Sequence, residues 1–347
     1  MATLHDVAKA AGVSATTVSY VINNRTGHYS DATRIQVLKA MKSVGYIPNS
    51  VARSLVLNRT ETFGILLSSI LDEPFNRALR AGQSVLNKAG YDVIVTETQS
   101  NVDREQQALA NMLSRRVDGI LFISGSRHMD YGHIKEFLKS GTPMVVVNRY
   151  LPEGITDQVI IDNKVGVREI IAHLAAQGHE RIGCLHNRLQ GPTASMANKQ
   201  RVEGYLEGMR AADLPVNENW MASCAFGNDY GVQSGSEAAR KLLTEEGLTA
   251  LVCVNDFIAA GAYRTAVSLG LRVPDDVAVT GHDNTILTRY HTPEITSVAQ
   301  PITEASAQAA KRLLTLVGGG SSAKPGQWMQ VLPTTSIIRA SSTYQRK

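Results

Sequence analysis

Polar side chains follow several short apolar runs of this sequence, at points where buried strands would end. With the run that precedes each, they are Ser68 and Ser69 (GILL), Ser124 (GILFI), Asn148 and Arg149 (MVVV), Asn255 and Asp256 (LVCV), and Asp283 (AVTGH). Ligands of open parallel sheets lie beyond the carboxyl ends of the strands. Any one of these residues alone indicates only the start of a loop, but as a set they favour a site for a small polar molecule.

Residues that would carry catalysis or hold a metal lack the necessary spacing. The sequence contains no G-x-S-x-G, H-E-x-x-H or G-x-x-x-x-G-K-[ST] motif, and no G-x-G-x-x-G after an expected strand. Its nine histidines show no metal-ligand spacing, and Cys184, Cys224 and Cys253 form neither a C-x-x-C pair nor a disulfide framework. We therefore predict no catalytic residue, no metal and no cofactor, in a protein that is not an enzyme.

A second polar set lies near the N-terminus with the spacing of one helix face. The positions i, i+3, i+4 and i+7 hold Thr16, Ser19, Tyr20 and Asn23. Ala15 lies at the exposed start of the same helix, whereas Val18, Val21 and Ile22 occupy its apolar face. A helix with such an outward stripe has the form of a recognition helix, which lies in the major groove of DNA.

Three short helices are expected to position that stripe. The first is capped by Thr3 and stops at Gly12, because glycine readily takes the left-handed conformation of a helix end. Ser14 caps the second helix, and the third runs from about Ser30 to Gly45. We expect this third helix to bury Ile35, Leu38 and Met41. Helix, glycine turn and helix make a helix-turn-helix, although a three-helix bundle with a solvated polar face would show the same pattern.

The positive charge of the chain is concentrated in this first segment. Residues 1–59 contain seven Lys or Arg against two Asp, a net charge of +5, whereas the remainder contains 28 basic and 29 acidic residues, a net charge of −1. Such asymmetry is typical of a segment that binds a polyanion. A basic end that only aids solubility would have the same charge.

From residue 62 onward, short apolar runs alternate with amphipathic helices such as 75–89 and 104–115. The expected strands cover 63–67, 93–96, 119–123, 144–147, 159–161, 182–185, 250–254 and 277–280. This alternation predicts an α/β body of two doubly wound parallel-sheet lobes. No apolar run is long enough for a membrane span, and the N-terminus lacks the pattern of a signal peptide, so we expect a cytoplasmic protein without a membrane partner. A periplasmic solute-binding protein would share the body but would need that signal and lack the basic head.

The sequence resembles the lactose/galactose repressor family of bacterial transcription regulators. In the head the resemblance rests on TLHDVAKAAGVSATTVSYVINN and YSDATRIQVLKAMKSVGYIPNSVARSL. In the body it rests on RRVDGILFISG, HLAAQGHERIGCL, QRVEGY, CVNDFIAAGAY, LGLRVPDDVAVTGHDN and YHTPEITSVAQP. It implies a helix-turn-helix head with a hinge helix, followed by an effector domain similar to periplasmic sugar-binding proteins.

The resemblance also implies which residues contact DNA. It places Ala15, Thr16 and Tyr20 at base edges, and it places near phosphates Thr3, Ser14, Thr17, Ser19, Asn23, His28, Ser30 and Thr33. A hinge helix over 49–59 would contribute Asn49 as its cap, Ala52, Arg53, and Leu55 as a wedge in the minor groove. Many members of the family carry arginine at the position of Tyr20, so the operator base read there is expected to differ.

For the effector, the resemblance implies contacts from Ser69, Phe75, Ser124, Asn148, Arg201, Phe226, Asn255 and Asp283. Arg201 and Asp283 are the pair expected to clamp a polar ligand from one lobe. Sugar-binding members often have aspartate where this chain has Asn148, which argues against assuming a simple sugar. No role is assigned between Asn187 and Arg201.

The expected organisation is a DNA-binding domain (1–48), a hinge (49–59) and an effector-binding and dimerisation domain (60–347). One lobe would comprise 60–158 and about 290–322, the other 159–289 and 323–340, with the glycines from Gly318 in a surface loop. The C-terminus shows no leucine heptads, so a homodimer on a pseudo-palindromic operator is expected. A small polar effector, a sugar or related metabolite, would control the operator affinity of what we interpret as a repressor.

Overall fold

A computed structural model describes residues 2–47, 59–124, 131–189, 195–225, 229–319 and 325–344. The chain divides into two compact units, Met1–Glu61 and Thr62–Lys347, here called the head and the body. The expected hinge residues Asn49, Ala52, Arg53 and Leu55 lie outside the described residues, as does Phe226.

The head consists of α1 (Leu4–Ala11), α2 (Ala15–Ile22) and α3 (Asp31–Val44). The predicted caps are confirmed: Thr3 forms a capping box, Gly12 ends α1 with a φ of 61°, and Ser14 caps α2. Small apolar residues fill the core, namely Val7, Ala8, Ala11, Val18, Val21, Val37 and Ala40. The predicted helix-turn-helix arrangement is therefore present.

The buried face of α3 differs from the prediction. Val37 and Ala40 are buried, whereas Ile35 is 66% exposed, Leu38 is 42% exposed, and Met41 is only partly buried. Both sets recur with helical spacing, so periodicity alone does not choose between them. The orientation is fixed by Gln36, whose Nε2 donates to the Ala11 carbonyl at 2.7 Å, and small residues at the contact let α1 approach closely.

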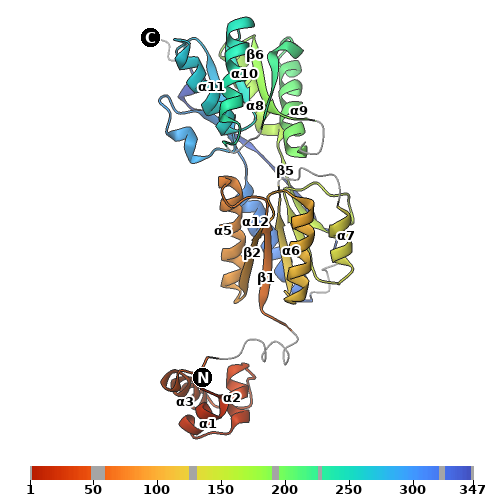
Figure 1. Ribbon diagram of the computed structural model, residues 1–347, viewed down its shortest axis with the longest axis vertical. Helices are drawn as coiled ribbons and strands as arrows, with labels where there is room; N and C mark the ends of the chain where they lie inside the picture. The colour runs from red at the N-terminus through yellow and green to blue at the C-terminus, as the bar shows by residue number, and fades with distance from the viewer. Residues whose placement is uncertain are drawn as a thin grey trace. The chain divides into compact units, whose positions relative to one another are not determined.

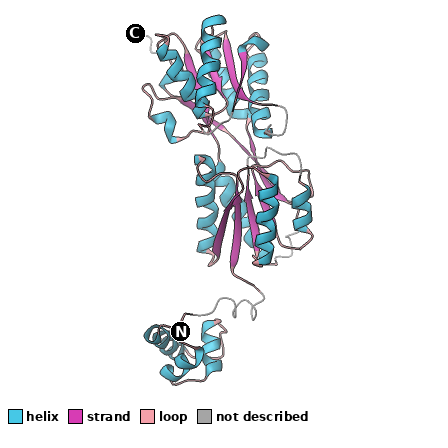
Figure 2. Cartoon of the chain, in the orientation of Figure 1, coloured by secondary structure: helices cyan, strands magenta, loops and turns pink. Residues whose placement is uncertain are grey.

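The body contains two six-stranded sheets, each covered by helices on both faces (Figures 1 and 2). The first lobe is built on the order β11-β5-β4-β3-β1-β2, in which all pairs are parallel. Its strands are β1 (Thr62–Leu67), β2 (Asp92–Glu97), β3 (Gly119–Ile123), β4 (Met144–Val147), β5 (Asp157–Asp162) and β11 (Met329–Pro333). The fold class expected from the alternation of strands and helices is confirmed.

The second lobe has the order β12-β10-β9-β8-β6-β7, with only β12 antiparallel to its neighbour. Its strands are β6 (Ile182–Asn187), β7 (Met221–Cys224), β8 (Ala250–Cys253), β9 (Ala278–His282), β10 (Thr296–Ala299) and β12 (Thr335–Ile337). Four of the twelve strands in the described chain, β7 and β10–β12, were not predicted, because they are short and carry polar residues.

Helices cover both faces of each sheet. In the first lobe, α5 (Glu73–Lys88) and α12 (Ile302–Val317) pack on one face, and α6 (Val102–Ser114) and α7 (Gly132–Leu138) pack on the other (Figure 1). In the second lobe the helices are α8 (Lys164–Ala176), α9 (Met196–Ala211), α10 (Val232–Glu245) and α11 (Asp256–Ser268). Three short 3-10 turns complete the elements, η1 (Glu218–Trp220), η2 (Ile286–Arg289) and η3 (Ala340–Ser342).

The three crossings between the lobes come later in the chain than the sequence indicates. All of β5 belongs to the first sheet, β10 belongs to the second, and β11 returns to the first. The crossings therefore follow residues 162, 299 and 333 instead of 158, 289 and 322. The physical reason is continuous pairing: Asp157 already pairs with Val145, and Thr296 pairs with Thr280, so neither strand can be divided at the expected boundary.

Candidate functional site

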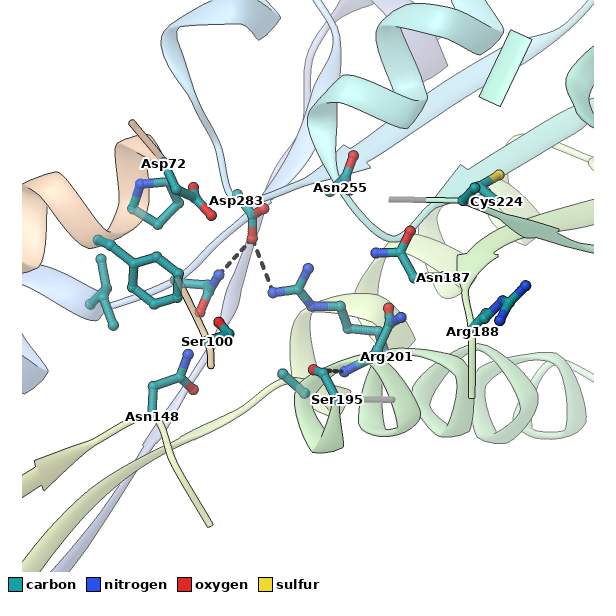
Figure 3. A pocket seen from close by; sticks show the side chains of 17 residues that line it. Asp72, Ser100, Asn148, Asn187, Arg188, Ser195, Arg201, Cys224, Asn255 and Asp283 are labelled. Atoms are coloured by element: carbon teal, nitrogen blue, oxygen red, sulfur yellow. Dashed lines mark hydrogen bonds and ion pairs between the residues drawn. The ribbon is translucent and has the colours of Figure 1, made fainter. Parts of the chain in front are cut away.

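A pocket of about 350 Å³ lies between the lobes of the body (Figure 3). From the first lobe and the crossing before α12 it is lined by Asp72, Pro74, Phe75, Ser100, Asn148, Gln300 and Ile302. From the second lobe it is lined by Asn187, Arg188, Ser195, Ala197, Asn198, Arg201, Cys224, Ala225, Asn255 and Asp283. A volume of this size lies at the lower end of the range of small-molecule sites, about 300–1,000 Å³, and suits a small metabolite.

Five of the eight predicted effector contacts line this pocket. They are Phe75, Asn148, Arg201, Asn255 and Asp283. Ser69 and Ser124 are not among its lining residues, and their hydroxyls are engaged locally: Ser69 Oγ accepts from the Leu71 amide, and Ser124 Oγ accepts from Ser68. Serine at a strand end can satisfy a nearby backbone or side-chain group as readily as a ligand.

Sequence reasoning missed much of the segment between β6 and α9. Asn187 ends β6, Arg188 follows it, and Ser195 caps α9 through a hydrogen bond from the Asn198 amide. The apolar pattern predicts a strand that ends at Leu185, whereas β6 continues to Asn187, so Asn187 is a strand-end residue that the pattern does not indicate. The S-x-x-N spacing of Ser195 and Asn198 was the available signal for a helix start facing the site.

Arg201 and Asp283 pair with each other inside the pocket (Figure 3). Arg201 Nη2 lies 3.0 Å from Asp283 Oδ1, and the two side chains are 11% and 16% exposed. Arg201 also donates through Nε to Asn163 Oδ1 and through Nη1 to the Val254 carbonyl. The guanidinium is thereby held in one orientation before any ligand arrives.

The carboxylate of Asp283 is also held by neighbours other than Arg201. Gln300 Nε2 donates to Asp283 Oδ1, and His282 Nδ1 lies 3.0 Å from the same atom. Burial raises the pKa of Asp283, but Arg201, His282 and Gln300 outweigh burial, and the pKa lies below its ordinary value. Burial lowers the pKa of His282 to about 4. At neutral pH the pocket therefore presents a fixed carboxylate beside a fixed guanidinium.

Three side-chain amides of the lining have buried oxygens without a hydrogen-bond partner among the described residues. They are Asn148 Oδ1, Asn187 Oδ1 and Gln300 Oε1. Asn148 is 5% exposed and adopts a φ of 58°, which turns its side chain away from the regular strand direction. A buried polar atom without a partner costs about 1–3 kcal/mol. A ligand that donates hydrogen bonds would recover that free energy.

Asn148 is fixed in place by its neighbour in the chain. Arg149 is fully buried, donates through Nη1 to Glu105 Oε2 on α6 at 2.7 Å, and lies over the Phe122 ring at 5.2 Å. His133 on α7 contacts the same Glu105 oxygen at 2.8 Å. Burial raises the pKa of Glu105, but His133 and Arg149 outweigh burial and hold the pKa below its ordinary value. This buried cluster ties the end of β4 to α6 and α7.

Two contacts at the edge of the pocket join the lobes. Arg77 on α5 donates through Nη2 to the Asp283 carbonyl at 2.8 Å, and Glu73 on α5 accepts from the Ile286 amide at 2.8 Å. Asp283 adopts a φ of 101°, a left-handed conformation that favours glycine. The segment that carries a pocket carboxylate is thus held directly by the first lobe.

In the head, each predicted DNA-contact residue that the structure describes lies at least partly at the surface. Three of these residues have a structural task, because Thr3, Ser14 and Ser30 cap the three helices. The Ser14 and Ser30 hydroxyls lie 2.9 Å from those of Thr17 and Thr33. A capping side chain lies at a helix N-terminus, where backbone N–H groups can hold a phosphate.

The described residues contain no group of three or more His, Cys, Asp or Glu side chains that could hold a metal ion. The three cysteines are buried and free, and burial raises the pKa of the Cys224 thiol to about 12. None of the described helices is long and apolar enough to cross a membrane.

A helix-turn-helix head followed by a two-lobed body with a polar pocket between the lobes defines a ligand-responsive DNA-binding regulator. Residues 3–49 match the bacterial regulatory proteins of the lacI family, and residues 171–342 match the periplasmic binding protein-like domain. The chain is 32% identical over 342 residues to the transcriptional regulator DegA of Bacillus subtilis (strain 168), covering 98% of each chain. It therefore belongs to the LacI family.

Further relatives agree in sequence and in structure. The transcriptional repressor PurR of Photobacterium profundum is 34% identical over 304 residues, 87% of each chain. The lac repressor dimer bound to operator and the anti-inducer ONPF superposes with a TM-score of 0.83 at 27% identity, covering 99% of each chain. The complex of the regulator CelR with cellobiose gives 0.70 at 29% identity, covering 98% of this chain and 100% of that one. The chain is a DNA-binding transcriptional repressor with an effector-binding domain, and these relatives are regulators, not enzymes.

Proposed function

We propose that a small, neutral, hydroxyl-rich effector of the sugar class binds between the lobes and controls operator affinity. The observation that carries this proposal is the set of three buried amide oxygens without partners around the Arg201–Asp283 pair. A hydroxyl both donates and accepts, so it can satisfy an amide in either orientation. Asp72 and Asp283 balance Arg188 and Arg201 in the lining, so no excess charge calls for an acidic ligand. Solved relatives carry cellobiose and ribose.

The proposed effector contacts are Phe75, Asn148, Arg201, Asn255 and Asp283, extended by Asn187, Asn198 and Gln300. The ring of Phe75 offers an apolar face on which a sugar ring could lie, while the amides and the ion pair hold hydroxyls. Ser69 and Ser124 are not retained, because neither lines the pocket. Phe226 stays a prediction outside the described residues.

We further propose a homodimer that acts in the cytoplasm, with each head in one half-site of a pseudo-palindromic operator. The lac repressor in the matched structure is a dimer on its operator. Exposed apolar side chains in the body suit a second copy: Ile70 and Leu71 precede α5, Ile286 begins η2, and Tyr290 follows it. The Glu73–Ile286 hydrogen bond holds these two segments together. The head contacts given above remain proposals.

We propose that α5 couples effector binding in the pocket to operator affinity. An effector that contacts Asp283 acts on the segment whose backbone is held by Arg77 and Glu73. A ligand that prefers one arrangement of the lobes over another changes operator affinity by its difference in binding free energy, typically about 1–3 kcal/mol.

Thermal unfolding of the full chain against a panel of neutral sugars, polyols, sugar phosphates and nucleobases tests the effector class. A ligand at 100 times its Kd adds about 2.7 kcal/mol of stability, which raises the melting temperature measurably. We expect shifts with neutral hydroxylated compounds, and loss of the shift in Arg201→Met but not in Arg272→Met, whose arginine pairs with Asp276 at the surface. A panel without any shift, or a shift confined to phosphates, would contradict the proposal.

A further inference from the structure

The recognition helix α2 bears no charged side chain, but a cation from the segment that follows the helix lies against its outward stripe. Its sequence ATTVSYVI contains only polar and apolar residues. Arg25 lies three residues after Ile22, and its guanidinium lies over the Tyr20 ring, 5.9 Å from the ring centroid. A cation at this distance from an aromatic face is attracted by the electrons of the ring.

The backbone after α2 explains how Arg25 returns to Tyr20. Asn24 adopts a φ of 50°, and the Arg25 amide donates to the Tyr20 carbonyl at 2.9 Å. This bond closes the chain back over the last turn of the helix. The position of Arg25 beside Tyr20 is therefore set by main-chain hydrogen bonding as well as by the ring contact.

His28 holds the Tyr20 ring through a further contact. The centroids of the two rings lie 4.5 Å apart, with their planes inclined by 32°. Aromatic pairs at this separation are attractive by about 0.5–1.5 kcal/mol beyond their buried area. With Arg25 and His28 both against it, Tyr20 has less freedom to reach a base with its hydroxyl than a lone tyrosine on the helix surface.

The guanidinium remains open for a partner. Within the described head, the Arg25 side chain makes no hydrogen bond or ion pair, and the residue is exposed. A guanidinium that stacks through its face keeps its N–H edges available, and such an edge donates two hydrogen bonds to the O6 and N7 acceptors of guanine.

We infer that Arg25, stacked on Tyr20, is a specificity-determining residue that reads one base pair in each operator half-site. Tyr20 acts mainly through its ring, against which the Arg25 guanidinium stacks, and His28 holds that ring in position by packing against it. This assignment rests on the helix-turn-helix head lying on operator DNA. It differs from a role in which Tyr20 reads a base alone, or in which Arg25 only neutralises a phosphate.

Selection from a pool of DNA duplexes with randomised central base pairs, followed by sequencing, tests this inference on the full chain. We expect the wild type to enrich a two-fold symmetric motif, and Arg25→Ala to lose preference at one symmetric pair of positions, with at least a tenfold loss of affinity for the enriched duplex. Tyr20→Phe keeps the ring and should keep the motif, whereas Tyr20→Leu should relax the same position as Arg25→Ala. Arg25→Lys keeps the charge but not the paired donors, so the position should be relaxed there too.

Lys42→Ala, which removes one exposed positive charge elsewhere in the head, is the matched control and should leave the motif unchanged. Equal weakening by Arg25→Ala on every sequence would show a phosphate contact and overturn the assignment. A changed motif in Tyr20→Phe would show direct reading by the hydroxyl and overturn it as well. If the wild type enriched no symmetric motif, the operator-binding role of the head would fail together with this inference. A normal wild-type motif that Arg25→Ala leaves intact would sink this inference alone.

Discussion

Glu105 and Arg149 form an ion pair in the interior of the first lobe, with 2.7 Å between Glu105 Oε2 and Arg149 Nη1 and side-chain exposures of 2% and 1%. Arg149 directly follows Asn148, whose amide faces the pocket. Removing charge from water costs several kcal/mol per ion, so such a pair is a poor source of stability in itself. The pair instead fixes the position of the residues at the end of β4, because only one placement of Arg149 keeps its hydrogen bond to Glu105.

Breaking this pair from one side should be far more damaging than replacing it. Arg149→Met leaves the buried carboxylate of Glu105 with only His133, and we expect a loss of about 3–5 kcal/mol in the free energy of unfolding. The double variant Glu105→Met/Arg149→Met should recover most of that loss. Urea unfolding followed by circular dichroism measures both. Arg272→Met, which breaks an exposed pair, should cost no more than about 1 kcal/mol. Equal losses in the single and double variants would contradict this account.

The contact between Arg77 and the Asp283 carbonyl should matter for coupling more than for effector binding. We expect Arg77→Met to retain the effector found by thermal unfolding, but to reduce the ratio between its Kd values with and without operator DNA. A reduction by a factor corresponding to about 0.5–2 kcal/mol would be typical of a residue in a coupling path. Isothermal titration of both states gives the ratio. Arg80→Met, an exposed arginine one turn further along α5, is the control and should change nothing.

The apolar side chains beside η2 should be needed for dimer formation. Leu71 and Tyr290 are each 79% exposed in the single chain, which is unusual for large apolar residues unless another surface covers them. We expect Leu71→Asp/Tyr290→Asp to sediment as a monomer and to lose most operator affinity, because two linked heads bind far more tightly than one. Val216→Asp, at another exposed apolar position, should remain a dimer. A double variant that stays dimeric would rule out this surface.

The sequence predicted the pocket residues that directly follow clearly apolar strands. Asn148, Asn255 and Asp283 follow recognisable apolar strands, and the carboxyl ends of parallel strands meet at one edge. Gln300 was missed because it follows β10, whose residues TSVA give a weak strand signal. The prediction of the buried face of α3 was wrong because two sets of apolar residues share helical spacing. Which set is buried depends on packing against the other helices of the head.

Residue type alone also cannot say which polar groups remain available for a ligand. Ser124 and Asn148 each directly follow a strand, but the Ser124 oxygen accepts a hydrogen bond from Ser68, whereas the amide oxygen of Asn148 has no partner among the described residues. That difference depends on contacts between segments far apart in the sequence. The place of Arg25 over Tyr20 is a different case, because it depends on a local turn after α2 that helical periodicity does not reveal.

Asp256 is a buried carboxyl group behind the pocket. It accepts hydrogen bonds from Ser297 Oγ and from both the amide and the hydroxyl of Thr285. Burial raises the pKa of Asp256 to about 7, and the negative charge of Asp283 contributes to the rise. The neighbouring strand carries Gly281, where a Cβ atom would lie 2.3 Å from Asp256 Oδ1. Neighbouring residues thus pack closely around the Asp256 carboxyl group, and burial favours its neutral form below about pH 7.

This raised pKa makes the stability of the body depend on pH in a defined direction. Between about pH 4 and 7 the folded state holds a proton that the unfolded state has released, so stability should fall as pH rises through this window and level off above it. Asp256→Asn should remove this component, so the stability difference between variant and wild type should shift in favour of the variant from pH 5 to pH 8. The lowered pKa of His282 makes stability change with pH in the opposite direction, but this contribution is the same in variant and wild type and drops out of the difference. Melting curves at both pH values measure the difference; an unchanged difference would mean that Asp256 stays ionised throughout.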